Sequence, residues 1–551
     1  MASPKSSGLL GLDPALVKEI DWDLAVERIL YDLKSDFIYA PHLRFIYARA
    51  RRGLIDHVRR ELTAGTFSIG TPITIDVPKS NRVRVSRSKR LGPNFTRPGS
   101  ILLPQDRLLY QAIGNEMAGP INDNYIKERS YSHIVDDSES ERMFASSRSC
   151  WNNLQRSLTR HAEKDDVSYV IKFDIANYFG SINQHILINI LSDIGCDRGL
   201  LTRLESMLTD LTGHRSSRGI IQGLNTSDLL GNFYMMPIDR FFEDNGVASA
   251  RYVDDVYVFV RDYEDAFQLF KKLIPELRSY DLILNEFKTY ILPKRHLVTD
   301  EPDLEKLFDE AISEISSQLD DEELSDDYGF QMDWEDDESL DDDEEDEDED
   351  ERDVSEEIEL KATEILFDSI KDYPGHDESI ERFCIPIFQR AKSDYAIEHI
   401  MIFFDDRPSM TQVYSSYLSS FIDRDDVIEF LASELRDDGY NDWQRMWIIA
   451  ALLQSSHNDS DTVRTAHNIL INANHHEALR AVAAIFVGKY GDFSRRRNLA
   501  TIYPGVSEYI KSAIYFSSMY WGSVERSNAK ASWGMQGLLN RLVTAGFASK
   551  K

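Results

Sequence analysis

Apolar and polar positions follow two different patterns in the first 300 residues of the chain. Residues 167–173 and 250–260 are rich in β-branched and aromatic residues, which is typical of strands. Residues 186–194 and 265–277 carry apolar side chains at helical spacing. This part of the chain is therefore predicted to mix helices with a sheet, as an α+β structure.

The last 194 residues show a helical pattern throughout. Amphipathic segments are predicted near residues 378–404, 410–422, 425–437, 442–455, 460–473, 475–490, 505–521 and 530–546. Helix pairs recur at roughly 35 residues, a period typical of α-solenoids. Residues 477–492 resemble one HEAT-type helix and turn. An all-α, HEAT-like repeat region is predicted over 358–551, with an irregular helical bundle as the alternative.

An acidic segment separates these two parts. Residues 320–353 contain 23 Asp or Glu and one Arg, which gives a local charge of −22. Like charges at this density repel one another and bury no core, so residues 316–357 are predicted to form a disordered linker. Nucleic-acid mimicry and binding of a basic partner are the alternatives. The predicted domains are therefore 1–315, 316–357 and 358–551.

Composition narrows the function classes. Although the net charge is −33, residues 1–300 hold 39 basic and 39 acidic residues and are neutral. Residues 49–97 hold twelve basic and three acidic residues, which form either a solvated face or a surface that meets phosphate. An apolar fraction of 42% excludes a wholly disordered chain.

The hydropathy pattern, the N-terminus and the cysteines predict a cytoplasmic protein that does not enter a membrane. There is no apolar run of membrane-spanning length, and the N-terminus lacks the apolar core of a secretory signal. Three distant cysteines favour neither a disulfide framework nor a structural zinc site.

Three carboxylates carry the candidate chemistry. Asp174 follows a predicted strand directly, and the adjacent Asp254 and Asp255 interrupt a β-rich run, as in a hairpin with acids at its turn. Adjacent acids at a turn repel each other unless cations neutralise them. On neighbouring strands they would hold two Mg²⁺ ions, or Mn²⁺, through oxygen ligands. Such a pair can activate a 3′-hydroxyl and stabilise a leaving pyrophosphate.

Ordered motifs around these acids resemble those of reverse transcriptases. They read FDIANYFGSI at 173–182, QGLNTSDLLGN at 222–232, YVDD at 252–255 and LNEFKT at 284–289, like the family's motifs A to D. Upstream, RPGSILLPQDRLLYQAI at 97–113 is similar to the fingers motif of bacterial members. The resemblance covers roughly residues 70–295. It implies the fingers and palm of a right-hand polymerase and an RNA-directed DNA polymerase that uses dNTPs and makes DNA.

The resemblance also implies roles for individual residues. Asp174, Asp254, Asp255 and the carbonyl of Ile175 match metal ligands, and Phe179 matches the aromatic gate that excludes a 2′-hydroxyl. Gln222, Gly223 and Arg97 match nucleotide-binding positions, with the arginine on the triphosphate. Lys79 matches its companion lysine, for which Lys89 is an equal candidate. Lys288 matches the lysine proposed to protonate pyrophosphate.

Departures from the family pattern refine this interpretation. Ile221 stands where a proline is usual, and Asp228 replaces the proline of Thr-Ser-Pro, which places a carboxylate near the template or nucleotide path. No thumb is evident after Lys294, and no ribonuclease H, maturase, endonuclease or integrase signature is present. A polymerase joined to helical repeats resembles bacterial antiphage reverse transcriptases, including the abortive-infection type.

That narrower resemblance leaves template and partners open. It implies either a non-coding RNA template or template-independent, protein-primed synthesis, and homo- or hetero-oligomers formed through the helical domain, including with a partner reverse transcriptase. A mobile-element enzyme is an alternative. An alternative of another class is a non-catalytic helical scaffold with a decayed polymerase, against which the intact acids argue.

Overall fold

The computed structural model describes residues 11–84, 91–136, 141–213, 216–297, 304, 307–308, 311–312 and 349–549. The first elements are α1 (Pro14–Glu19), α2 (Trp22–Asp32), α3 (Pro41–Arg49), α4 (Arg51–Ala64), the antiparallel strands β1 (Ile73–Arg84) and β2 (Leu91–Ile101), and α5 (Pro104–Asp123). Local chemistry sets several ends. The Asp21 carboxylate accepts from the Leu24 amide at 2.9 Å and caps α2, and Gly65 ends α4 in the left-handed conformation.

A second set of elements surrounds a four-stranded antiparallel sheet with the strand order β4-β5-β3-β6. In chain order these elements are α6 (Ser147–Ala162), β3 (Tyr169–Phe173), α7 (Tyr178–Ser181), α8 (Gln184–Asp193), α9 (Arg198–Leu211), α10 (Asn225–Tyr234), α11 (Met236–Asp244), β4 (Ala248–Tyr252), β5 (Asp255–Val260), α12 (Tyr263–Ser279), η1 (Glu286–Lys288), β6 (Tyr290–Pro293) and η2 (Lys294–His296). The strands and helices expected at 167–173, 186–194, 250–260 and 265–277 are all present. We call this unit the palm.

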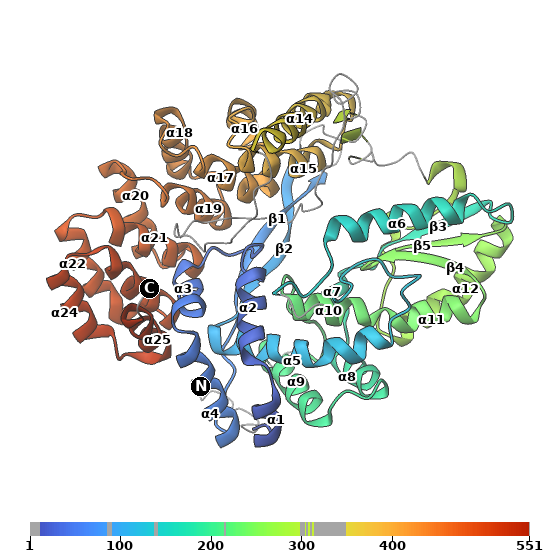
Figure 1. The fold of residues 1–551 in the computed structure, drawn as a ribbon, viewed down its shortest axis with the longest axis horizontal. Coiled ribbons are helices and arrows are strands. Elements are labelled where there is room, and N and C mark those ends of the chain that lie inside the picture. The colour runs from blue at the N-terminus through green and yellow to red at the C-terminus, as the bar shows by residue number, and fades with distance from the viewer. Residues whose placement is uncertain are drawn as a thin grey trace.

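The two faces of the palm sheet are covered by different helices (Figure 1). Leu154 and Leu158 of α6 pack in a small core with Val170, Ala250 and Phe259 of the sheet. Helices α11 and α12 pack against the sheet as well. This cover explains why β3 and β5 are nearly continuous runs of apolar residues rather than alternating ones.

The last described part is entirely helical. It contains α14 (Glu349–Asp368), η3 (Ser369–Asp372), α15 (Asp377–Arg390), α16 (Ile397–Phe403), η4 (Pro408–Met410), α17 (Thr411–Ser419), α18 (Asp425–Arg436), α19 (Asp442–Leu452), α20 (Ser460–Ile471), α21 (Glu477–Tyr490), α22 (Phe493–Ile502), η5 (Tyr503–Gly505), α23 (Glu508–Ser517), η6 (Ser518–Tyr520), α24 (Ser523–Trp533) and α25 (Gly537–Ala548). We call it the helical region. Helices α17, α19, α21 and α23 pack successively on one another, and α18, α20 and α22 pack beside them. The HEAT-like classification of this arrangement stays a prediction.

Three details differ from the expected helix pattern. The segment 378–404 is two helices, α15 and α16, rather than one. Helix α22 and most of α24 were not expected, because polar residues dominate both and only Leu499 of α22 is buried. Finally, α14 begins at Glu349, so the predicted linker 316–357 overlaps this helix at residues 349–357. Residues 316–348 lie outside the described residues.

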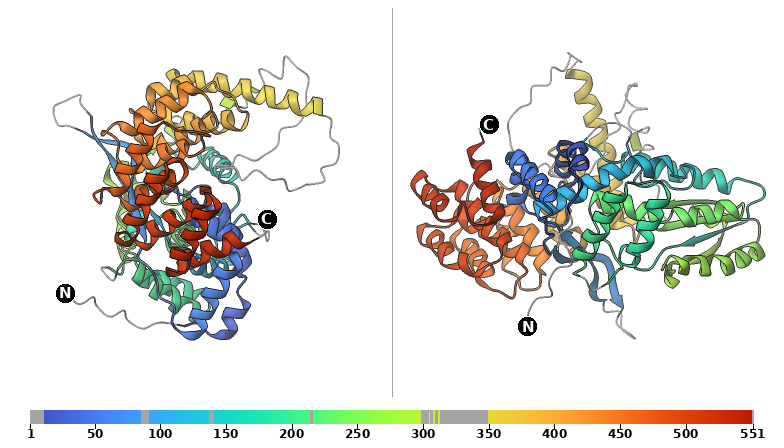
Figure 2. Two further views of the ribbon diagram at one scale, coloured as in Figure 1. Left: turned by 90° about the vertical axis from the view of Figure 1, so that its left-hand side faces the viewer. Right: turned by 90° about the horizontal axis from the view of Figure 1, so that it is seen from below.

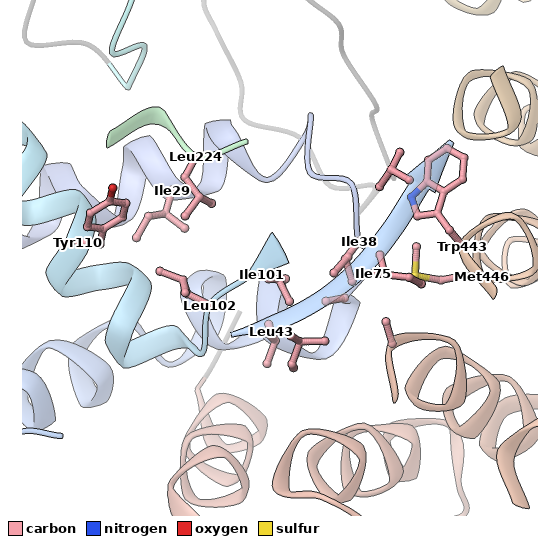
Figure 3. Packing of buried hydrophobic residues seen from close by; sticks show 14 of the residues in the cluster. Ile29, Ile38, Leu43, Ile75, Ile101, Leu102, Tyr110, Leu224, Trp443 and Met446 are labelled. Carbon is pink, nitrogen blue, oxygen red and sulfur yellow. The ribbon is translucent and has the colours of Figure 1, made fainter. Parts of the chain in front are cut away.

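One continuous hydrophobic core joins the N-terminal elements to the helical region. Figures 1 and 2 place α2, α3 and α4 between the palm and the helical region. Helices α23 and α25 pack on α3, and α19 and η4 pack on β1. Figure 3 shows Trp443 and Met446 of α19 beside Ile38 and Ile75. Within the described part of the chain, no helix has the length and apolar character needed to cross a membrane.

Candidate active site

The three predicted acids meet at one end of the palm sheet. Strand β3 ends at Phe173, which lies opposite Val256 of β5, and Tyr252 pairs with Asp255 across the β4–β5 hairpin. Asp174 therefore leaves β3 directly beside the turn that carries Asp254 and Asp255. The expected hairpin with acids at its turn is present.

The carboxyl group of Asp254 is strongly perturbed. Burial raises its pKa to about 7, and the negative charges of Asp174 and Asp255 and a hydrogen bond with Asp174 act in the same direction. Asp174, itself only 8% exposed, accepts a hydrogen bond from Asn285 Nδ2 at 2.9 Å on its Oδ2. The charges at this end of the sheet are therefore closely coupled.

Lys288 joins the same cluster from η1. Its Nζ lies 3.2 Å from Asp174 Oδ2. Burial acts to lower the pKa of Lys288, but the carboxylates of Asp174, Asp255 and Asp254 outweigh it, and the pKa is raised. The ammonium group is thus kept protonated beside the acids, on a side chain that is half exposed.

The acids fit divalent cations by their chemistry. Among the described residues no three His, Cys, Asp or Glu are already arranged as a metal site. However, burial and then the charges of the neighbouring carboxylates raise the pKa of Asp254, and a divalent cation would offset both effects. Carboxylate oxygens are also the ligands that Mg²⁺ prefers. Ile175, the fourth predicted ligand, is buried and forms an isolated bridge with Leu284 directly after Asp174.

A buried arginine holds the acid turn in place. Val253 has a φ of 55°, which is costly for a β-branched residue. Arg251 Nη1 donates to the Val253 carbonyl at 3.0 Å, and the Val253 amide donates to Ser132 Oγ at 2.8 Å. Arg251 is only 1% exposed and pairs with Asp239 of α11 at 2.8 Å and with Asn232 of α10. Hydrogen bonds from the surrounding structure therefore hold Val253 in its strained conformation.

Phe179 lies on α7, the short helix that follows β3 and Asp174. Its ring is half buried, is edge-to-face with Tyr178 and passes close to Gly231 of α10, where a Cβ would be 2.9 Å from Cε1. The Tyr178 hydroxyl also donates to the Gly231 carbonyl. Gly231 is therefore needed for Phe179 to take this position.

Phe37, which the motifs did not identify, connects the remaining nucleotide-binding candidates. Gly223 has a φ of 85°, and a Cβ there would lie 2.8 Å from Phe37 Cε2. The Arg97 guanidinium lies over the same ring, 4.4 Å from its centre. Gln222, half buried, precedes Gly223. Gly223 thus permits close approach of an aromatic ring of the protein itself.

The two candidate lysines are less closely connected. Lys79 is exposed on β1, and its carbonyl accepts from Asn94 Nδ2 at 2.7 Å. Lys89 lies outside the described residues. The structure therefore brings together Asp174, Ile175, Asp254, Asp255 and Lys288 in one cluster, and Gly223 and Arg97 in a second around Phe37.

Asp228, the departure from the family pattern, lies in the first turn of α10. Burial, assisted by the charge of Asp32, raises the pKa of Asp228 well above its usual value. His133 Nε2 is 3.9 Å from Asp228 Oδ2, but burial and the charge of Arg251 lower the pKa of His133 to about 4. His133 is therefore neutral at pH 7 and does not offset the charge of Asp228, whose pKa stays raised.

Comparison with known protein families gives a match over residues 96–299. This stretch, less than half of the chain, matches the family model described as "Reverse transcriptase (RNA-dependent DNA polymerase)". The match shows that this stretch is similar to reverse transcriptase domains. It contains every predicted site residue except Lys79, and it begins later than the expected residue 70. The comparison with curated proteins finds no match.

Three telomerase structures are among the similar solved structures. Apo telomerase from Candida tropicalis is 11% identical with a TM-score of 0.31 and covers 76% of this chain and 80% of its own. The Candida albicans and Candida tropicalis enzymes with a TWJ fragment of telomeric RNA are 12% and 11% identical, with TM-scores of 0.28 and 0.32. They cover 74% and 75% of this chain, which spans 66% and 65% of theirs. At these identities and TM-scores, the likeness to telomerases assigns no function to this chain.

Proposed function

We propose that this protein is a reverse transcriptase that synthesises DNA by two-metal nucleotidyl transfer and serves antiphage defence. The observation that carries the chemistry is the buried contact between Asp174 and Asp254 inside the reverse transcriptase domain. Two buried carboxylates this close are costly unless a proton or a cation lies between them. The proposed defence role is supported by the order of a polymerase domain and a helical region, which resembles that of antiphage reverse transcriptases.

In the proposed mechanism, Asp174, Asp254 and Asp255 would hold two Mg²⁺ ions together with the carbonyl of Ile175. When bound, the ions would activate the primer 3′-hydroxyl and offset the charge that develops on the pyrophosphate. The residues of the chain supply orientation and a proton. Lys288 Nζ, kept protonated by the acids, is placed to donate a proton to the leaving pyrophosphate.

Other residues of the proposed site would hold the nucleotide. The Phe179 ring, supported by Gly231, would lie under the sugar and exclude a 2′-hydroxyl, which favours deoxynucleotides. Gln222 and the backbone of Gly223 would contact the nucleotide, and Arg97 would bind its phosphates. A planar guanidinium suits phosphate oxygens because it donates two parallel hydrogen bonds.

Template-independent synthesis is a second candidate, and Asp228 favours it. Burial raises the pKa of Asp228, and a carboxyl group that holds a proton can donate to a base as well as accept from it, as a template base does. Priming from a helical-region tyrosine has few candidates. Tyr414, Tyr417, Tyr509 and Tyr515 are at most 2% exposed, whereas Tyr395 is 40% exposed.

The test is incorporation of each labelled dNTP by the purified full-length protein with Mg²⁺. Reactions with and without an RNA template annealed to a DNA primer are compared, and the products are sequenced after protease and nuclease treatment. Copying that requires the RNA supports the first candidate, and protease-sensitive DNA made without it supports the second. The Asp254→Asn variant should make no product while remaining folded. If the wild type incorporates no dNTP under either condition, a non-catalytic scaffold replaces the proposal.

A further inference from the structure

The β1–β2 hairpin rests directly on the helical region. Ser80 Oγ of β1 donates to Glu378 Oε2 of α15 at 2.5 Å, and Ser409 Oγ of η4 donates to the same oxygen at 2.7 Å. Arg82 of β1 donates to the Asp406 carbonyl just before η4. The strand that pairs with the Arg97 strand is therefore fixed to α15 and η4.

Arg382 lies one helical turn after Glu378 on α15. Its Nη2 donates to the Ser409 carbonyl at 2.9 Å, and its side chain is 38% exposed. The nearest carboxylate oxygen, Glu378 Oε2, is 3.9 Å away and already accepts two hydroxyl donors. Burial lowers the pKa of Arg382 although the charge of Glu378 opposes this. The guanidinium is thus only partly neutralised.

Arg97 faces the same junction from β2. It lies opposite Val77 in the hairpin register, with its guanidinium over Phe37. Its buried Nε has no hydrogen-bond partner, and no described carboxylate forms an ion pair with it. Burial and the positive charge of Arg382 both lower its pKa. The contacts of the β1–β2 hairpin with α15 and η4 therefore bring both arginines to one junction. Two positive charges at one junction are unfavourable unless an anion offsets them.

We infer that Arg382 of the helical region and Arg97 of the β1–β2 hairpin form one composite site for the triphosphate of the incoming nucleotide. The inference rests on the proposed function and adds a residue outside the reverse transcriptase domain to its nucleotide site. Guanidinium groups from two elements can bind different phosphate oxygens, and Phe37 links this pair to Gly223. The helical region is then part of the active site.

The test compares Arg382→Gln and Arg382→Lys with Arg390→Gln. Arg390 lies on the same helix and pairs with Glu359 at 2.7 Å, so it is a matched control. Steady-state KM and kcat for dNTP and the inhibition constant of inorganic tripolyphosphate are measured. Arg382→Gln should raise KM and the inhibition constant together by roughly ten- to a hundredfold, the size expected for a charge-assisted contact. Arg382→Lys should recover part of this loss, and Arg390→Gln should change neither constant.

Two results would overturn the inference. One is an unchanged KM and tripolyphosphate inhibition constant in Arg382→Gln. The other is a fall in kcat alone together with a lower melting temperature, which would indicate a structural role. Calorimetric titration of tripolyphosphate into the wild type and Arg382→Gln separates the inference from the proposed function. If the wild type makes no DNA but binds tripolyphosphate, and Arg382→Gln does not, the polymerase proposal fails and the composite site stands.

Discussion

At the scale of single residues, the burial of Asp254 beside two other acids determines the pKa of its carboxyl group. Its two neighbouring acids and its burial raise its pKa from 3.8 to about 7. Because the folded-state pKa is the higher one, folding takes up a proton between these pH values. The free energy of unfolding contributed by this group is therefore largest below pH 4 and is lost as the pH rises through 7. A divalent cation bound by the acids, as proposed, would restore stability where the proton has left.

This linkage predicts a pH-dependent effect of Mg²⁺ on stability. Saturating Mg²⁺ should raise the melting temperature by a few degrees at pH 8, as expected for about 2–3 kcal/mol of binding energy, and by much less at pH 5.5. Asp254→Asn should abolish the difference, whereas Asp165→Asn, an exposed residue in the turn before β3, should keep it. Scanning fluorimetry measures each shift. Equal shifts at both pH values, or an unchanged shift in Asp254→Asn, would remove Asp254 from the metal site.

The acids could be located from sequence because their signal is local. A strand followed by Asp174 and a strand interrupted by two acids fix register and turn within a few residues, and the motifs agree with them. Phe37, Arg251 and Arg382 had no such signal. Each acts through contacts with other elements of the fold, such as Asp239 of α11 for Arg251 and Gly223, 186 residues away, for Phe37. Sequence spacing carries no information about those contacts.

At the scale of elements, the segment between α2 and α3 links the proposed nucleotide site to the helical region. The Phe37 carbonyl accepts from Trp443 Nε1 of α19 at 2.7 Å, and the Asp36 carbonyl accepts from Gln412 Nε2 of α17 at 3.1 Å. The Asp36 side chain is paired with Arg107 of α5. The backbone that carries the Phe37 ring is therefore held on both sides.

Trp443→Phe should consequently weaken nucleotide binding. The change keeps an aromatic ring in the core but removes the donor to Phe37, which should cost roughly 1–2 kcal/mol of stability and raise KM for dNTP several-fold. Trp521→Phe is the control, because Trp521 Nε1 makes an equivalent bond to the Gly488 carbonyl at 2.9 Å. Denaturant unfolding and steady-state kinetics give the two quantities. If both variants lose stability and neither changes KM, the segment only supports the fold.

The prediction of helices succeeded where one face of a segment is apolar and failed where it is not. Helices α18 (Asp425–Arg436) and α20 (Ser460–Ile471) begin and end within two residues of the predicted segments. Helix α22 contains the run Arg495, Arg496 and Arg497, and packing with α21 positions it although its own pattern is weak. Tertiary contacts thus determine where the polar helices form. They also determine how β1 packs on η4.

At the scale of the whole molecule, the extent of the hydrophobic core differs from the domain boundaries that the charge pattern predicts. The predicted boundaries followed charge, with the acidic segment separating two domains. The core instead runs from the N-terminal helices into the helical region without a break. Helices α3 and α25 belong to opposite ends of the sequence and pack together. Composition shows where a chain is polar, but it cannot show which apolar faces meet, so this connection was not predictable.

The acidic segment itself yields a prediction about nucleic-acid binding. Deleting residues 320–348 removes 19 Asp and Glu and no Lys or Arg, changes the net charge from −33 to −14, and leaves α14 intact. Because the removed charge repels phosphate, KM for an RNA template annealed to a DNA primer should fall several-fold at low salt and little at high salt. With a saturating template and primer, kcat should stay the same, since no residue of the proposed site is removed.

A Gly/Ser segment of equal length in place of residues 320–348 separates charge from length. It should reproduce the lower KM of the deletion at low salt, because both variants lose the same charge. Should only the deletion change KM, chain length rather than repulsion is responsible. A lower kcat in both variants, or a changed oligomeric state by light scattering, would make the acidic segment part of the catalytic or assembly machinery. An unchanged KM at every salt concentration would mean that these charges lie too far from the bound nucleic acid to act through an aqueous, screened field.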